Sequence, residues 1–231
     1  MNSAIRSATK QDADFLSWAI LSAARSHLAK GWFDIVLEGS ESSRHDFIRR
    51  LTLTPARSWW HYSRFFIAEV EGIPAATLCA FRAGDAYPLS QQAMTEVARE
   101  LGWSDLQQQA IWKRGAYIFA CTLETGEDAW AIENVATLPL YRGRGLASQL
   151  LKRAVEEAQR SGARQMPSRS SLGMTRLRER IQKRDSTSQV RSAVRTLKQR
   201  PVHRACDVLA ARFDGSTQRR VALDLDHNFN E

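Results

Sequence analysis

The chain has 231 residues, of which 43% are apolar and 25% are charged, and its formal net charge is +8. That length suits one domain of ordinary size, or a domain with a tail, and the apolar share is enough to bury a core. Its apolar runs fall far short of the ~20 residues of a membrane span, and its first residues lack the pattern of a secretory signal. The three cysteines stand singly and the five histidines form no metal-ligand pattern, which predicts a cytoplasmic protein with free thiols and no metal site.

The first half of the chain predicts a strand, two helices and a hairpin of two strands, over residues 4–9, 10–29, 40–51, 64–70 and 73–82 in turn. Asp12 is in position to cap the first of these helices, whose apolar residues recur at helical spacing. The two strand-like runs of the hairpin are joined by a short Glu-Gly link, which is a hairpin signal.

The second half predicts a polar helical stretch, two more strands and a long amphipathic helix, over residues 88–112, 117–123, 129–138 and 145–163. The two strands are indicated by their β-branched and aromatic content. The apolar residues of the last helix fall on one stripe, and Gly162 is a natural stop. A strand followed by a turn and a helix is therefore expected at residues 129–163.

Two Arg-Gly pairs, residues 142–145, fill that turn. The first N–H groups of a helix have no partner within the helix, and the helix dipole places partial positive charge there. Gly143 and Gly145 remove Cβ atoms that would keep an anion away, and Arg142 and Arg144 add charge complementary to phosphate. The spacing fits neither the P-loop nor the first-strand dinucleotide fingerprint. The loop thus indicates a pyrophosphate site, and the alternative is a plain turn, in which Arg-Gly pairs also occur.

At these residues the sequence resembles the GNAT superfamily of acyl-CoA N-acyltransferases. The family signature, Gln/Arg-x-x-Gly-x-Gly/Ala at a strand-to-helix junction, is matched by Arg142, Gly145 and Ala147. The stretch "ENVATLPLY" resembles the family's fourth strand and "GLASQLLKRAVEEA" its third helix. The resemblance covers about residues 3 to 165. It implies an α/β GNAT fold, with a mixed and mostly antiparallel sheet flanked by helices.

The resemblance implies transfer of an acetyl group from acetyl-CoA, the co-substrate, to a primary amine of a small molecule or peptide. In the family the loop amides bind the CoA pyrophosphate, and this role carries over to Arg142, Gly143, Arg144, Gly145, Leu146 and Ala147. The backbone of the fourth strand pairs with pantetheine, a role that carries over to Val135, Ala136 and Thr137. The identity of the acceptor and the oligomeric state, a homodimer included, stay open.

Glu133 is the candidate general base, because an ammonium must lose a proton, often through water, before it can attack. The alternative is that Glu133 has only a structural role, as a strand carboxylate paired with a neighbouring group. Asn134 is a polar alternative, expected on the other face of the strand. The aromatic cluster at residues 59–62 could line an acceptor pocket, but such a cluster before a strand is more often part of the core.

Residues 166–231 carry 14 Lys and Arg against 7 Asp and Glu, whereas residues 1–165 carry 19 against 18. All seven tryptophans lie at or before Trp130. This shift predicts a GNAT N-acetyltransferase domain over 1–165 and a basic, poorly ordered tail over 166–231. A basic tail keeps open a second function, nucleic-acid binding through neutralised phosphates. The lack of Trp and Tyr as stacking platforms in the tail argues against it.

The tail is further expected to be translated in the wrong frame, which would leave the fold incomplete at the C-terminus. GNAT sequences continue with a fifth strand, then Gly-Asn and a helix carrying Tyr-x-Lys-x-Gly-Phe, and none of these stands in register here. Joining the third base of each codon to the next two bases permits "GND" across residues 172–175 and "A··AY·KAGF" across 176–186. Weakened cofactor binding and little or no turnover are then expected. The alternative is a genuine basic extension.

Overall fold

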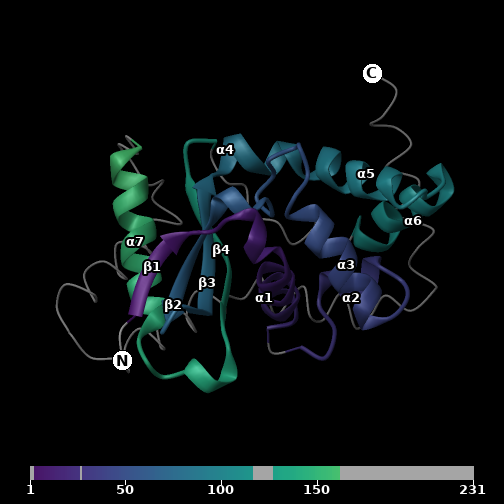
Figure 1. Ribbon diagram of the computed structural model, residues 1–231. Coiled ribbons are helices and arrows are strands. Elements are labelled where there is room, and N and C mark those ends of the chain that lie inside the picture. Colours follow the sequence, from purple (N-terminus) through teal and green to yellow (C-terminus); the bar gives the residue numbers. More distant parts are fainter. Residues whose placement is uncertain (1–2, 27, 117–126, 162–231) are drawn as a thin grey trace.

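The structure, a computed structural model, describes residues 3–26, 28–116 and 127–161. Within these residues it has an α/β architecture, in which a four-stranded sheet lies between helices (Figure 1). Neighbouring strands all pair antiparallel, in the order β1-β2-β3-β4. The strands are β1 (Ser3–Ser7), β2 (Phe65–Val70), β3 (Ile73–Arg82) and β4 (Trp130–Thr137).

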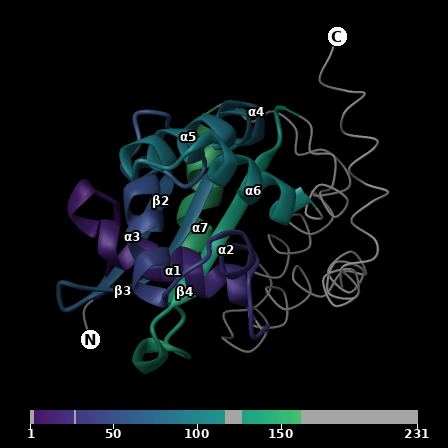
Figure 2. The same cartoon turned by 90° about the vertical axis from the view of Figure 1, so that its right-hand side faces the viewer.

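Helices cover both faces of the sheet. One face packs against α7 (Leu146–Arg160), and the other faces a helical layer that Figure 2 shows from the front. That layer contains α1 (Ala13–Arg25), α2 (Trp32–Val36), α3 (Glu41–Leu51), α5 (Ser90–Glu100) and α6 (Asp105–Gly115). A short helix, α4 (Ala83–Ala86), follows β3 directly.

Two apolar clusters result, one on each side of the sheet. Alternate residues of β3 divide between them: Leu78 lies in the cluster under α7, and Cys79 lies in the cluster under the helical layer. Most of the apolar stripe predicted for α7 is buried in the first cluster, where Leu150 has no exposed surface, and Val155 of that stripe is only partly buried. This alternation follows from the two-residue period of a strand.

The predicted hairpin is confirmed as β2 and β3, joined at Glu71 and Gly72. Both link residues have positive φ angles, 55° and 79°. Two consecutive positive φ angles define the type I′ turn, whose twist matches that of the flanking strands. The Glu-Gly signal therefore had a direct physical basis.

Asp12 does not cap α1 as expected, because α1 begins without a side-chain cap bond. Its carboxylate instead accepts two hydrogen bonds from Arg6, at 2.8 and 2.7 Å, and one from the Thr9 N–H at 2.7 Å. Burial acts to raise the pKa of Asp12, but the bonds from Arg6 and Thr9 outweigh it and lower that pKa. Asp12 thus ties β1 to the start of α1.

The helical stretch predicted over 88–112 is divided into α5 and α6. The break comes at Gly102, where φ is +71°, and the N-cap residue of α6 is Ser104, whose side chain forms a capping box with Gln107. The short 3-10 turn η3 (Tyr87–Leu89) leads into α5. The five-residue helix α2 was not predicted, because so short an element has no clear period.

The aromatic cluster at residues 59–62 belongs mostly to the core. Trp60 and His61 are 5% and 4% exposed, whereas Trp59 and Tyr62 are half-buried at its edge. Burial, with the nearby charges of Arg57, Arg64 and Lys10, lowers the pKa of His61 to about 4. His61 is therefore a neutral core histidine at physiological pH.

Two predicted parts of the chain, the strand over 117–123 and the tail over 166–231, lie outside the described residues. The boundary between a domain over 1–165 and a tail stays a prediction. None of the helices in the described part of the chain combines the length and apolarity needed to cross a membrane.

Candidate functional site

A β-bulge interrupts β4 in the middle of the predicted site. Glu133 pairs with Cys79 and Ala136 with Thr77, so two residues of β4 lie opposite Leu78 alone. The extra residue is Asn134, whose φ of +51° is in the left-handed region. Because one residue is inserted, Ile132 and Val135 both pack on the α7 side, three positions apart.

Glu133 lies on the opposite side of the sheet, where its Oε1 accepts a hydrogen bond of 3.2 Å from the Tyr87 hydroxyl. The sequence predicted that Asn134 would face the other side of the sheet from Glu133, and because of the bulge this prediction is wrong. Its Nδ2 contacts Cys79 Sγ at 3.5 Å, and Cys79 belongs to the same apolar cluster as Tyr87. The side chains of Glu133 and Asn134 therefore both contact groups on the helical-layer side.

The neighbours of Glu133 stay protonated. Burial raises the pKa of Tyr87 above its usual value, and the Glu133 carboxylate raises it further. The same two causes raise the pKa of the buried Cys79 thiol, while the bond from Asn134 acts weakly in the other direction. Neither group can therefore add a negative charge beside Glu133 near neutral pH.

The Arg/Gly loop follows β4 through the 3-10 turn η5 (Pro139–Tyr141). Arg142 Nε donates to the Thr137 carbonyl at 3.3 Å, which ties the loop back to the end of the strand. Arg144 donates to the Leu140 carbonyl at 3.1 Å and lies 5.0 Å from the centre of the Tyr141 ring. Both arginines are exposed, so the loop presents their charge to solvent.

Both loop glycines have the left-handed backbone that glycine favours, with φ of +85° at Gly143 and +77° at Gly145. A Cβ built on Gly145 would meet no atom of the described residues within 4 Å. Gly145 is the residue before α7, and α7 begins without a side-chain cap. The open space beside Gly145 therefore lies at the start of α7, where backbone N–H groups are available as donors.

Those donors are the N–H groups of Gly143, Gly145, Leu146 and Ala147, which have no acceptor in residues 3–26, 28–116 and 127–161. The earliest bonds of the helix run from Ser148 and Gln149 to the Gly145 carbonyl. N–H groups at a helix start combine with the helix dipole into an anion-binding position. The structure thus supports the chemistry expected of the loop.

Several residues predicted for the cofactor come together, and the side chain of Glu133 faces the other side of the sheet from that of Val135. Val135 packs in the same apolar cluster as Leu146, and the bond of Arg142 joins the loop to Thr137. The sequence analysis did not predict that Tyr87 belongs to the site. No motif surrounds it, and its partner lies 46 positions away.

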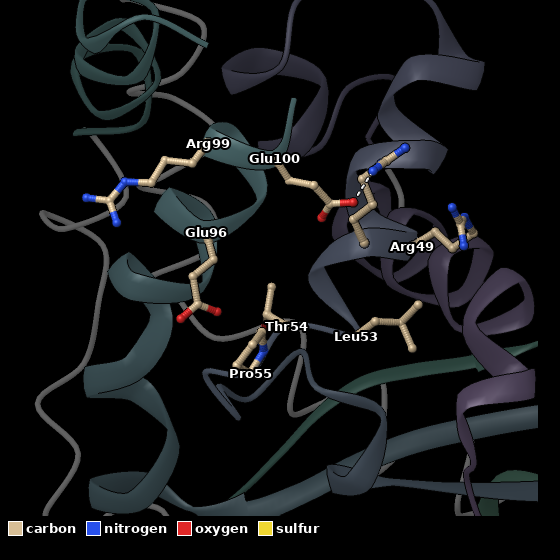
Figure 3. A pocket seen from close by; sticks show the side chains of 8 residues that line it. Arg49, Leu53, Thr54, Pro55, Glu96, Arg99 and Glu100 are labelled. Atoms are coloured by element: carbon tan, nitrogen blue, oxygen red, sulfur yellow. Dashed lines mark hydrogen bonds and ion pairs between the residues drawn. The ribbon is translucent and has the colours of Figure 1, made fainter. Parts of the chain in front are cut away.

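A separate cavity of about 470 Å³ lies between α3 and α5 (Figure 3). Its lining residues come from these helices and the segment after α3, and none belongs to β4, the loop or α7. Arg50 pairs with Glu100, which is labelled in Figure 3, and also with Asp46 at 2.8 Å. Glu96 accepts a bond from the Ala56 N–H at 3.0 Å. These contacts join α3 to α5.

No group of three or more potential metal ligands is found within the described ranges.

Comparison with known proteins adds to this geometry. The sequence matches the acetyltransferase (GNAT) family over residues 32–168. No curated protein matches the chain. A solved structure described as an acetyltransferase is 24% identical, with a TM-score of 0.54, covering 69% of this chain and 76% of its own. It shows the fold.

A second solved structure, an N-acetyltransferase from Staphylococcus aureus Mu50, is 22% identical with a TM-score of 0.47. It covers 67% of this chain and 75% of its own. The family match spans more than half of the sequence, and the antiparallel sheet with helices on both faces is the expected fold. The chain belongs to the GNAT acetyltransferase family and is a transferase of the N-acetyltransferase type.

Proposed function

We propose that this chain transfers an acetyl group from acetyl-CoA to the primary amine of a small molecule or peptide. The observation that carries the proposal is the start of α7, where four backbone N–H groups lack acceptors among the described residues. Left-handed Gly145 leaves open space beside them. Family membership supports acetyl transfer as the reaction type.

The loop fits the pyrophosphate of CoA in both charge and shape. Backbone N–H groups of Gly143, Gly145, Leu146 and Ala147 would donate to phosphate oxygens, and the exposed Arg142 and Arg144 would add positive charge. Arg142 donates to the Thr137 carbonyl, and Arg144 donates to the Leu140 carbonyl and lies against the Tyr141 ring, so both side chains stay close to the loop.

The backbone of β4 is proposed to pair with the pantetheine arm through Val135, Ala136 and Thr137. β4 is the last strand of the described sheet, so one of its edges faces away from β3. An edge strand offers N–H and C=O groups to an extended ligand. The bulge at Asn134 comes directly before Val135, the first of these three residues, and shifts their pairing with β3 by one residue.

Glu133 is proposed as the general base. Bound acetyl-CoA would supply the acetyl group as a thioester. Glu133 would take the proton of the amine, directly or through water, so that the nitrogen lone pair can attack the acetyl carbon. The new C–N bond forms as the C–S bond breaks, and the sulfur leaves with the electron pair of that bond.

The domain is proposed to span residues 1–165, with residues 166–231 forming a basic tail that does not complete it. The chain resembles a complete GNAT domain only up to about residue 165. Because the last part of the domain would be missing, turnover is expected to be low. The proposal therefore predicts that acetyl transfer is slow but measurable.

Acetyl-CoA labelled in its acetyl group tests the function directly. The chain is incubated at high concentration with a panel of small-molecule and peptide primary amines, and labelled products are counted by mass spectrometry. We expect the label on the nitrogen of at least one amine, dependent on enzyme. Label released only as acetate, with every amine unmodified, would contradict amine acetylation.

A further inference from the structure

We propose that Tyr87 is a positioning residue for the reaction, holding the Glu133 carboxylate in place for proton uptake. The inference rests on the proposed role of Glu133 as the base. It begins from one contact, the hydrogen bond of 3.2 Å from the Tyr87 hydroxyl to Glu133 Oε1.

The Tyr87 ring is held on two sides by other aromatic rings. Phe81 lies edge to face with it, at 5.0 Å between centroids and 88° between planes. Trp59 meets it at 5.8 Å and 67°. Such T-shaped contacts restrict the ring. The direction in which the hydroxyl points is therefore set by packing and not by the hydrogen bond alone.

Backbone hydrogen bonds hold the segment before Tyr87 against the residues that precede β4. Ala83 donates its N–H to the Ala129 carbonyl at 2.8 Å, and Gly84 donates to the Glu127 carbonyl at 2.9 Å, which continues the β3–β4 pairing past the strand ends. The Ser90 hydroxyl then donates to the Tyr87 carbonyl at 2.7 Å. These bonds hold Tyr87 beside a strand that lies more than forty positions away in sequence.

The chemistry of the contact suits a base. Because the pKa of Tyr87 is raised by burial and by Glu133, its hydroxyl keeps its proton and acts as a donor. A neutral donor stabilises the ionised carboxylate, the form that accepts a proton. A Glu side chain has several rotatable bonds, and the hydrogen bond from a fixed ring limits the positions that its oxygens occupy.

The first test is Tyr87→Phe, which keeps the ring and removes the hydroxyl. We expect kcat to fall about tenfold, since hydrogen bonds to charged groups are among the stronger ones. The KM for acetyl-CoA should be unchanged, because Tyr87 does not belong to the loop. Tyr62→Phe is the matched control. It removes the same hydroxyl from a half-buried tyrosine whose ring lies 4.3 Å from His61, and kcat should not change.

The second test separates positioning from packing by combining Tyr87→Phe with Glu133→Gln. If Tyr87 acts through Glu133, Tyr87→Phe lowers kcat in the parent chain but not in the Glu133→Gln variant. A further fall of the same size in the double variant would show a structural role and overturn the inference. Unchanged kcat in Tyr87→Phe, with a large loss in Glu133→Gln, would also overturn it while leaving the base intact. Unchanged kcat in Glu133→Gln would instead refute the proposed base.

Discussion

Glu133→Gln is expected to lower turnover on any accepted amine about 10²-fold or more at neutral pH. The amide keeps the size of the side chain and can still accept the Tyr87 hydrogen bond, but it cannot take a proton from the amine. The affinity for acetyl-CoA should change little, because the loop lies at the start of α7 and not beside Glu133. The loss should shrink at high pH, where the amine is already neutral.

Glu96→Gln makes the same change in the cavity between α3 and α5 and is the matched control. Because slow turnover is expected, labelled product is measured by mass spectrometry at high enzyme concentration, over a range of pH. Equal turnover of Glu133→Gln and the parent chain at pH 7 would show that Glu133 is only a paired strand carboxylate. A loss in Glu96→Gln instead would move the reacting site to the cavity.

Restoring the reading frame from residue 166 is expected to raise turnover about 10²-fold or more. The shifted frame permits a Tyr across the codons of Arg180 and Ile181, which resembles the family's general acid. A positioned acid is worth roughly 10²–10⁴ in rate. The shifted frame would also supply the strand that in this family splays from the fourth to admit pantetheine, so affinity for acetyl-CoA should rise as well.

The coding DNA decides whether this restoration can be built. The run "GND" followed by "A··AY·KAGF" should appear when each codon is read from its third base. An early stop codon, or a different run of residues, would show that the tail is a genuine basic extension. In that case salt-sensitive retention on DNA, lost on truncation at residue 165, would support the alternative of nucleic-acid binding.

Local patterns were enough to predict most of the described fold. The hairpin at residues 64–82 was found because Glu71 and Gly72 can form a type I′ turn. The helix after the loop was found because its apolar residues recur at helical spacing, and most of them are buried as expected. Ser40 was expected near the start of a helix, and it caps α3 through the Ser43 N–H. In each case the signal and its structural cause lie within a few residues.

The rest depended on contacts that no local pattern carries. Asn134 has a positive φ without being glycine, so nothing in the sequence marked the bulge that changes which side Asn134 faces. Asp12 resembled a helix cap, but Arg6 competes for its carboxylate. Tyr87 reaches Glu133 only because β3, α4 and η3 bring it beside β4. These features follow from tertiary packing.

The central claim is that the loop at the start of α7 binds acetyl-CoA, and calorimetric titration of Gly145→Ala tests it most directly. A Cβ on Gly145 would fill the open space beside the loop amides, so we expect affinity to fall at least about tenfold. Gly72→Ala is the matched control, since φ is +79° at Gly72 and +77° at Gly145, and a Cβ on Gly72 also meets no atom within 4 Å in the part of the chain that the structure describes. The two variants share the same backbone strain, roughly 1–2 kcal/mol. Loss of affinity in Gly145→Ala with parental affinity in Gly72→Ala is the predicted result, and equal affinity in both variants and the parent chain would contradict the claim.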